Sequence, residues 1–110
     1  MNTMEKISFD YDGVLDTTKG KELAAEYILK GMPVYIITAR KLFYSGEVYA
    51  VAKKLGIPLN RIYFTGGRDK WHTIKRLKIT KHYDNNPKQI DMIIENTDAM
   101  AVKLKETRIN

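Results

Sequence analysis

The sequence predicts one α/β domain over residues 1–110, in which about five parallel strands form a sheet with helices on both faces. Three observations lead to this prediction. The 110 residues are 44% hydrophobic and include no cysteine, which suits a single globular domain that needs no disulfide. Short apolar segments rich in β-branched residues alternate with amphipathic segments of about a dozen residues. This alternation is typical of βαβ units, whose strands run parallel.

The first two strands and the helix between them are marked by their ends. Residues 7–10 are predicted as a buried strand. Residues 19–30 are predicted as a helix, because Gly31 and Pro33 stand where helices commonly end. Residues 34–38 give the strongest strand prediction, since this segment is β-branched and aromatic and directly follows Pro33.

Two helices in the middle of the chain have candidate N-terminal caps. Ser45 precedes an amphipathic segment that Gly56 ends, and Asp69 precedes a second one. Between them, residues 62–65 are predicted as the third strand. Trp71 falls on the apolar face of the second helix, where core packing is the simpler interpretation and stacking on a nucleobase is the alternative.

The last third of the chain supplies two more strands. Residues 79–84 are predicted as the fourth strand, and Asn86 followed by Pro87 is typical of a helix start. Residues 99–104 are predicted as a fifth strand at the edge of the sheet. Ligands of such sheets bind at the carboxyl ends of the strands. The residues that follow the strands are therefore the candidates for a functional site.

The positive charge is concentrated in the second half of the chain. The net charge is +6, and residues 56–110 carry 11 lysines and arginines against 6 acidic residues. The segment from Arg68 to Lys81 contains six basic residues and one acidic residue. Such a patch attracts polyanions such as nucleic acid, and a solvated helix face is the alternative.

Nothing in the sequence indicates a membrane protein or an exported one. The longest strongly apolar stretch, around residues 33–39, is far shorter than the roughly 20 residues of a membrane-spanning helix. Glu5 stands where a signal peptide has its apolar core. We therefore expect a cytoplasmic protein without a membrane partner.

Charged and polar side chains gather where the predicted strands end. Asp10 and Asp12 follow the first strand, Thr38 ends the second, Lys70 opens the helix after the third, and Asp84 ends the fourth. Clustered carboxylates repel one another unless a cation lies among them. The set therefore predicts a divalent metal with oxygen ligands, for which Mg²⁺ is the natural candidate. Lys70 and Thr38 are suited to hold phosphoryl oxygens beside it.

These residues resemble the motifs of the haloacid dehalogenase (HAD) superfamily of phosphohydrolases. Residues 10–15, Asp-Tyr-Asp-Gly-Val-Leu, match its first motif, Asp-x-Asp-Gly followed by Thr or Val. The motif threonine, lysine and fourth-motif acid match at Thr38, Lys70 and Asp84. The resemblance covers about residues 5–102 and implies a three-layer Rossmann-like HAD fold with strand order 5-4-1-2-3.

The resemblance implies a magnesium-dependent phosphatase that hydrolyses phosphoric monoesters through an aspartyl phosphate. Asp10 would be the nucleophile, and Asp12 the general acid that later acts as the base. The implied catalytic residues are Asp10, Asp12, Thr38 and Lys70. The implied substrate-binding residues are Gly13, Thr38, Ala39, Arg40 and Lys70. The implied metal ligands are Asp10, Asp12 through its main-chain carbonyl, Asp84 and Asn85.

Two rival interpretations of the first motif fail, and one lysine assignment stays open. A calcium-binding loop counted from Asp10 needs an oxygen ligand, Gly and Glu at places that hold Val14, Leu15 and Lys21. A phosphorelay receiver domain needs its aspartate after the third strand, where residues 64–67 read Phe-Thr-Gly-Gly. Lys70 is favoured as the motif lysine, with Lys75 as the alternative.

The gaps after the first and third strands are too short for an inserted cap domain. Only about two residues separate Asp16 from the first predicted helix, and four separate Thr65 from Lys70. The chain therefore resembles capless, nucleotidase-like or polynucleotide-phosphatase-like members. An open site suits a nucleic-acid terminal phosphate, with a nucleotide as the competing substrate, or else another subunit covers it.

Asn85 is the main departure from the family pattern, because the fourth motif commonly has a second acidic residue directly after the first or four or five places on, and here the next acid after Asp84 is Asp91. A neutral ligand weakens magnesium binding and favours an alternative, a HAD-like module that binds a phosphorylated or nucleic-acid partner without turnover. Asp12 argues for the enzyme, since a binding module has no use for a general acid.

Overall fold

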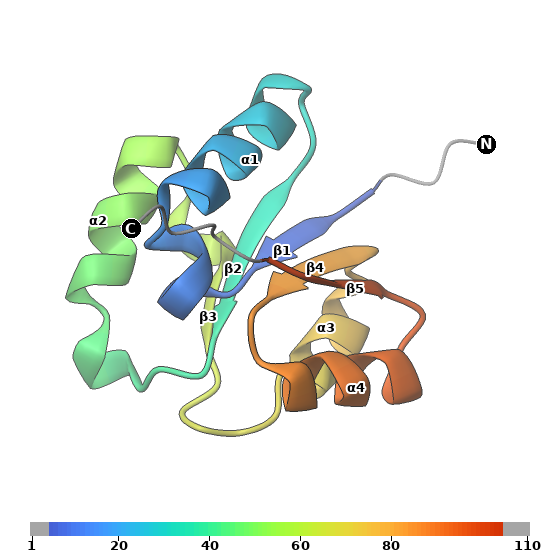
Figure 1. Cartoon of the computed structure of the whole chain (residues 1–110). Coiled ribbons are helices and arrows are strands. Elements are labelled where there is room, and N and C mark those ends of the chain that lie inside the picture. The colour runs from blue at the N-terminus through green and yellow to red at the C-terminus, as the bar shows by residue number, and fades with distance from the viewer. Residues whose placement is uncertain (1–4, 105–110) are drawn as a thin grey trace, which may run out of the picture.

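The computed structural model describes residues 5–104 and is built on one sheet of five parallel strands in the order β3-β2-β1-β4-β5 (Figure 1). The strands are β1 (Ile7–Phe9), β2 (Val34–Thr38), β3 (Ile62–Phe64), β4 (Lys81–Asp84) and β5 (Met100–Lys103). The helices are α1 (Thr18–Leu29), α2 (Gly46–Leu55), α3 (Trp71–Leu77) and α4 (Pro87–Asn96). Short helical turns are η1 (Tyr11–Leu15), η2 (Leu42–Tyr44) and η3 (Leu59–Arg61). The predicted five-stranded parallel sheet and its strand order 5-4-1-2-3 are confirmed.

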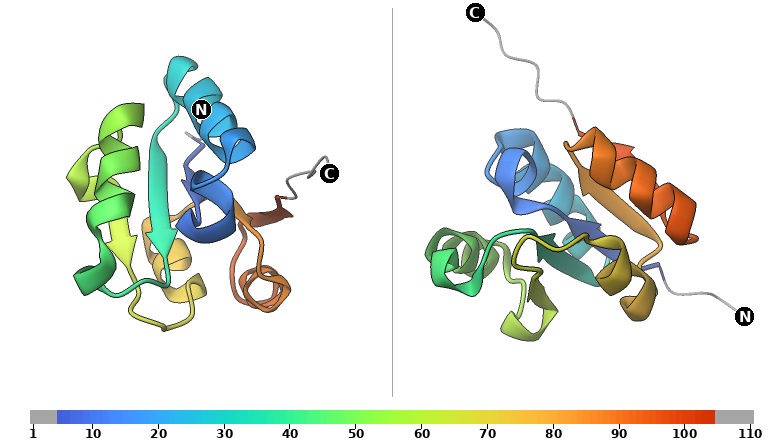
Figure 2. Two further views of the ribbon diagram at one scale, coloured as in Figure 1. Left: turned by 60° about the vertical axis from the view of Figure 1, so that its left-hand side comes forward. Right: turned by 90° about the horizontal axis from the view of Figure 1, so that it is seen from below.

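The sheet lies between two pairs of helices, with α1 and α2 on one face and α3 and α4 on the other (Figure 2). Neighbouring strand residues point to opposite faces. Ile36 accordingly packs in the cluster under α1 and α2, and Ile37 in the cluster under α3 and α4; both are fully buried. Because helices cover both faces of this parallel sheet, β2 is an almost uninterrupted apolar run.

Two of the predicted helix caps are wrong. Ser45 has helical backbone angles and makes no side-chain capping bond, because the chain enters α2 through the turn η2 and is already coiled there. Asp69 does not cap α3; its carboxylate accepts a hydrogen bond from Gln89 Nε2 at 3.1 Å. The predicted helix start at Asn86 and Pro87 is confirmed, and the side chain of Asn86 caps α4 by accepting a hydrogen bond from the main-chain nitrogen of Lys88 at 3.0 Å.

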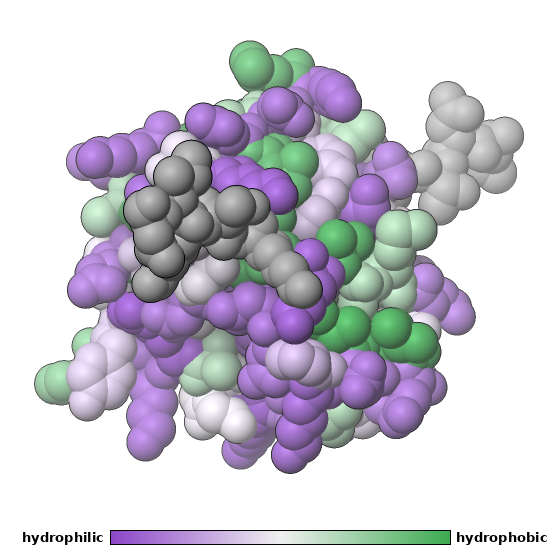
Figure 3. Space-filling model, in the orientation of Figure 1, coloured by the Kyte–Doolittle hydropathy of each residue, from purple (hydrophilic) through white to green (hydrophobic). Residues whose placement is uncertain are grey.

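The surface is polar over most of the face shown in Figure 3, with apolar side chains over β5 and the adjoining end of α4. The exposed Met100 and Ile94 belong to these two elements. In the part of the chain that the structure describes, no helix has the length and apolar character needed to cross a membrane.

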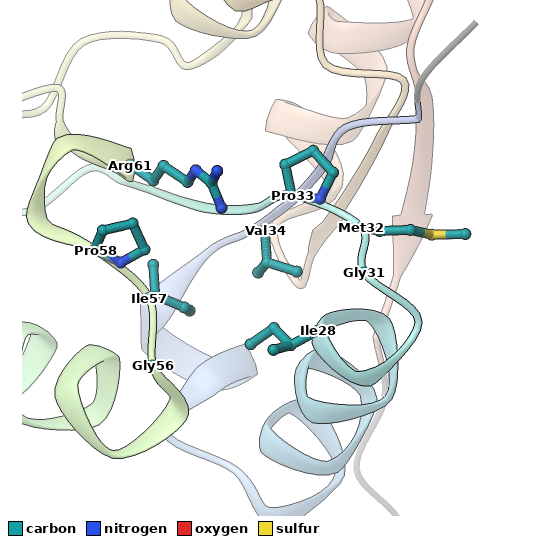
Figure 4. Close-up of a pocket in the computed structure, with 9 residues that line it drawn as sticks. All are labelled: Ile28, Gly31, Met32, Pro33, Val34, Gly56, Ile57, Pro58 and Arg61. Atoms are coloured by element: carbon teal, nitrogen blue, oxygen red, sulfur yellow. The ribbon is translucent and has the colours of Figure 1, made fainter. Parts of the chain in front are cut away.

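A cavity of about 330 Å³ lies at the amino ends of β2 and β3, between the end of α1 and η3 (Figure 4). Its walls include Ile28, Val34 and Ile57, and Arg61 is its one charged lining residue. It lies at the end of the sheet opposite to Asp10 and therefore has no part in the predicted site.

Gly20 lets α1 start in direct contact with the turn η1. A Cβ atom at this buried position would overlap the main-chain carbonyl of Val14. That carbonyl accepts a hydrogen bond from Thr17 Oγ1 at 2.6 Å, and the same oxygen of Thr17 caps α1 by accepting from the nitrogen of Gly20 at 3.0 Å. The close approach therefore fixes the turn that carries Asp12.

We expect Gly20→Ala to lower the free energy of unfolding by about 1–3 kcal/mol, because main-chain atoms must move to admit the methyl group. Gly46→Ala is the matched control, since Gly46 also lies in the first turn of a helix but has open space around its Cβ position. The control should be neutral or slightly stabilising. Denaturant unfolding of both variants measures the difference. If Gly20→Ala were as stable as Gly46→Ala, the turn η1 would tolerate displacement of its main chain by the added methyl group.

Candidate active site

The pairing of β1 with β4 brings two carboxylates together. Ser8 pairs with His82 in the parallel register, and the nitrogen of Asp10 donates to the carbonyl of Tyr83 at 2.9 Å. Alternate residues share a face of a strand, so Ser8 and Asp10 lie on the same side as His82 and Asp84. This is the α3–α4 side, since Tyr83 packs in the cluster under α1 and α2. The register alone thus places Asp10 beside Asp84.

A buried lysine bridges the two carboxylates. Lys70 Nζ lies 3.0 Å from Asp10 Oδ1 and 2.7 Å from Asp84 Oδ2. Lys70 is only 2% exposed although it belongs to the loop before α3, where its main-chain nitrogen donates to Gln89 Oε1 at 3.1 Å. Lys75 is exposed on α3. Of the two lysines left open by the sequence, the structure places Lys70 against the carboxylates.

Asp84 accepts hydrogen bonds at both of its oxygens. Oδ2 contacts Lys70 Nζ and lies 2.9 Å from His82 Nε2, and Oδ1 accepts from the nitrogens of Asn85 at 2.8 Å and Asn86 at 3.0 Å. A carboxylate has about four acceptor positions, so all of them are in use. Burial alone would raise the pKa of Asp84, but the hydrogen bond from His82 and the charge of Lys70 outweigh it and lower that pKa.

His82 is a fully buried partner of Asp84 that the sequence analysis did not assign to the site. Burial lowers the pKa of His82, so the ring is neutral. Because ionised Asp84 can only accept, Nε2 carries the proton, and the hydroxyl of Ser8 then donates to Nδ1 at 2.7 Å. The available signal was its position two residues before Asp84, which puts both side chains on one face of the strand.

Asp10 offers one oxygen to the site. Its Oδ1 accepts from the nitrogen of Tyr11 at 2.8 Å and contacts Lys70, whereas Oδ2 has no hydrogen-bond partner among residues 5–104. No fully buried side-chain oxygen in this range lacks a partner, so Oδ2 faces solvent. Burial raises the pKa of Asp10 to about 7; the charge of Asp84 acts in the same direction and that of Lys70 against it.

A cleft of about 460 Å³, here called the active-site cleft, opens above Asp10. The predicted site residues that line it are Asp10, Asp12, Gly13, Ala39, Lys70 and Asn85. Gly67, Arg68, Asn86 and Gln89 complete its walls. The structure therefore brings together both acids of the first motif, the lysine and Asn85.

Three predicted site residues do not line this cleft. Thr38 is fully buried, and its hydroxyl oxygen accepts a hydrogen bond from the nitrogen of Arg40 at 3.2 Å. Asp84 is also fully buried and contacts Lys70, a residue of the cleft wall. Arg40 directs its guanidinium to Asp12 instead. The substrate-binding roles of Thr38 and Arg40 stay predictions.

Arg40 holds Asp12 at the rim of the active-site cleft. Its Nη2 lies 2.8 Å from Asp12 Oδ1 and its Nε 3.0 Å from Oδ2, an arrangement in which both carboxylate oxygens are engaged. The guanidinium lies 4.8 Å from the centre of the Tyr11 ring, and Nη1 donates to the carbonyl of Tyr44 at 3.0 Å. The Asp12 side chain is nevertheless 54% exposed, so substrate can reach it.

Gly13 and Asn85 are in direct contact across the active-site cleft. Gly13 has a φ of 78°, which favours glycine, and a Cβ atom there would overlap the side-chain amide of Asn85. Gly13 is one of the substrate-binding residues that the resemblance implies. In the structure the carboxamide of Asn85 occupies the space next to it, so Asn85 lies beside the first motif.

The residues of the cleft fit an open type of magnesium site. Within residues 5–104 no three His, Asp or Glu side chains converge as a metal shell. Mg²⁺ is commonly bound through one or two carboxylates together with waters and substrate phosphate. The free Asp10 Oδ2 and the nearby Asn85 suit such a site, whereas Asp84 is fully buried and already accepts four hydrogen bonds.

Comparison with known proteins shows the fold. The structure resembles a solved protein of Vibrio cholerae described as a candidate 3-deoxy-D-manno-octulosonate 8-phosphate phosphatase, with a TM-score of 0.55 and 21% sequence identity. The match covers 86% of this chain but 62% of the other, so the chain spans less than two thirds of that protein's length. No family model matches the sequence, and the search of curated proteins gives no match.

We expect Lys70→Met to lower the free energy of unfolding by about 3–5 kcal/mol, because it leaves Asp10 and Asp84 adjacent in the interior without their cation. Lys75→Met removes a charge from the exposed side of α3 and should change stability by no more than about 0.5 kcal/mol. Denaturant titration without added metal measures both values. A mild effect of Lys70→Met would show that the carboxylates do not depend on the ammonium.

Proposed function

We propose that the protein is a magnesium-dependent phosphomonoester hydrolase that works through an aspartyl phosphate on Asp10. The observation that carries the proposal is the state of the two Asp10 oxygens. Oδ1 is held by Lys70 and the Tyr11 nitrogen, while Oδ2 faces the active-site cleft. A nucleophile fixed at one oxygen and free at the other is positioned for attack on phosphorus.

The proposed reaction has two displacements at phosphorus. In the first, Asp10 Oδ2 forms a bond to phosphorus, the bond to the leaving oxygen breaks, and Asp12 gives that oxygen its proton. In the second, a water oxygen attacks phosphorus, Asp12 takes the water proton, and the bond to Asp10 breaks to release phosphate. Asp12 is at the rim of the cleft where the leaving group would lie, as a general acid requires.

Several groups of the chain support these steps. The ammonium of Lys70 offsets the charge of Asp10 as a phosphate approaches, which reduces the repulsion between the two anions. Asp12 has to exchange its ion pair with Arg40 for the leaving oxygen, and the guanidinium then becomes available to a phosphoryl oxygen. Mg²⁺, which Asp10, the Asp12 carbonyl, Asp84 and Asn85 would hold, neutralises phosphate charge when bound.

The proposed substrate is a nucleotide or the terminal phosphate of a nucleic acid. The described connections from β1 to α1 and from β3 to α3 contain no inserted domain, so the active-site cleft is open on this side. Phosphatase activity is also what the solved neighbour is described as having. The alternative is a module that binds a phosphorylated partner without turnover, and the saturated hydrogen bonds of Asp84 favour it.

We expect Asp10→Asn to abolish phosphate release while the protein stays folded, and Asp12→Asn to lower kcat by about 10²- to 10⁴-fold, the usual contribution of a general acid. The assay measures phosphate release with and without Mg²⁺ from nucleotides, sugar phosphates, phosphopeptides and 5′- or 3′-phosphorylated oligonucleotides. Circular dichroism of each variant controls for folding. Full activity of Asp10→Asn would refute the mechanism, and a silent panel with intact Mg²⁺ binding would favour the binding module.

We further expect Asn85→Asp to lower the Mg²⁺ concentration that gives half-maximal activity, because it adds a charged oxygen ligand beside Asp10. Asn86→Asp is the matched control, since Asn86 lines the same cleft but its side chain is engaged in capping α4. Calorimetric titration with Mg²⁺ measures the affinity directly. An unchanged Mg²⁺ dependence of Asn85→Asp would place residue 85 outside the metal shell.

A further inference from the structure

A second cleft lies on the other side of the loop that carries Lys70. We call it the outer groove; it has a volume of about 690 Å³ and lies between β3 and α3. The lining residues that matter here are Tyr63, Gly67, Arg68, Asp69, His72 and Arg76. Apart from the shared Gly67 and Arg68, the lining residues of the outer groove are not those of the active-site cleft.

The outer groove adjoins the active-site cleft at the loop between β3 and α3. Gly67 and Arg68 line both. Gly66 and Gly67 have φ angles of 63° and 88°, and no atom lies within 4 Å of the position where either would carry a Cβ. The loop therefore presents bare backbone between the two clefts, with no side chain of these two residues in the way of an extended ligand.

The outer groove carries unpaired positive charge. Arg68 and Arg76 are exposed, and neither forms an ion pair within residues 5–104. Asp69 is the one acidic residue of its lining, and its carboxylate accepts a hydrogen bond from Gln89. Two arginines that form no ion pair among the described residues are suited to a phosphate group, which guanidinium binds with two parallel hydrogen bonds.

Aromatic surfaces accompany this charge. Tyr63 lines the outer groove, and the exposed ring of His72 is stacked on Trp71 with 3.6 Å between ring centres. Aromatic rings interleaved with arginines along a groove are typical of sites for single-stranded nucleic acid, where rings stack on bases and cations follow the backbone. A phosphopeptide has no regular series of phosphates and would not use both features.

We propose that the outer groove binds the phosphate next to the terminal one in a single-stranded nucleic acid. This inference rests on the proposed function, in which the terminal phosphate lies against Asp10. It selects among the substrates left open there: a strand with at least one internal phosphodiester is preferred over a mononucleotide. Arg76 and Arg68 hold the internal phosphate, and Tyr63 and His72 offer their rings to the adjacent base.

The test compares substrates of different length in the wild type, Arg76→Gln, His72→Gln and Lys75→Gln. Lys75 is the matched control, because it is an exposed cation on α3 that does not line the outer groove. The substrates are p-nitrophenyl phosphate, a mononucleotide, a phosphoserine peptide and a terminally phosphorylated single-stranded trinucleotide. The 5′- and 3′-phosphorylated forms of the trinucleotide are assayed separately.

For Arg76→Gln we expect kcat/KM on the trinucleotide to fall about tenfold, through KM, as the loss of one charged hydrogen bond implies. The rate of Arg76→Gln on p-nitrophenyl phosphate should equal that of the wild type. Lys75→Gln should have the wild-type kcat/KM on both substrates. Raising the salt concentration should weaken the preference of the wild type for the trinucleotide. The preference of Arg76→Gln should depend on salt less steeply. His72→Gln should lower kcat/KM on the trinucleotide without altering this salt dependence.

Other outcomes separate the two proposals. Hydrolysis of p-nitrophenyl phosphate without a preference for the trinucleotide, or a preference for the phosphopeptide, would overturn the outer-groove inference and leave the phosphatase intact. If no substrate is hydrolysed, the proposed function fails. Binding of the phosphorylated trinucleotide, measured by fluorescence anisotropy, then still tests the outer-groove inference. Weaker binding by Arg76→Gln than by Lys75→Gln would then support it, and equal binding would refute it.

Discussion

The ammonium of Lys70 between the carboxylates of Asp10 and Asp84 is the contact on which the rest of the site depends. Two carboxylates at neighbouring strand ends, one fully buried and the other nearly so, repel each other strongly unless one of them takes up a proton or a cation lies between them. Lys70 supplies that cation from within the chain. Because its side chain reaches the end of the sheet from the loop before α3, the same contact also ties this loop to β1 and β4.

The geometry of the sheet brings the two carboxylates together once the strands pair. Ser8 opposite His82 sets the register, and the period of two along each strand carries it to Asp10 and Asp84. A buried hydrogen-bonded chain results, in which Ser8 donates to His82 and His82 to Asp84. Such a chain is stabilising only when every member is satisfied. Within residues 5–104 no fully buried side-chain nitrogen or oxygen lacks a partner.

The sequence predicted the features that depend on periodicity and missed those that depend on how the chain enters or leaves an element. The parallel sheet and the approach of Asp10 to Asp84 follow from alternation and parallel pairing, which the pattern of residues records, whereas the strand order was implied by the resemblance. The cap predicted at Ser45 is absent because capping requires an extended backbone, and the chain is already helical there after turn η2. The cap predicted at Asp69 is absent, and its carboxylate accepts a hydrogen bond from Gln89 instead. Hydrophobic periodicity does not predict the course of a loop. It therefore could not show whether Thr38 reaches the cleft, or which of Lys70 and Lys75 reaches Asp10.

The loop between β3 and α3 joins two environments because its residues face opposite ways. Lys70, the last residue of the loop, points inward to two carboxylates and is shielded from solvent. Arg68 stays exposed and lines the clefts on both sides of the loop. The two glycines before it add no side chains. Since the described connections after β1 and β3 hold no inserted domain, the contacts that we propose beyond the reacting phosphate come from this loop and from α3. In the proposed function, substrates are distinguished by what continues along the surface, because no inserted domain among the described residues closes over them.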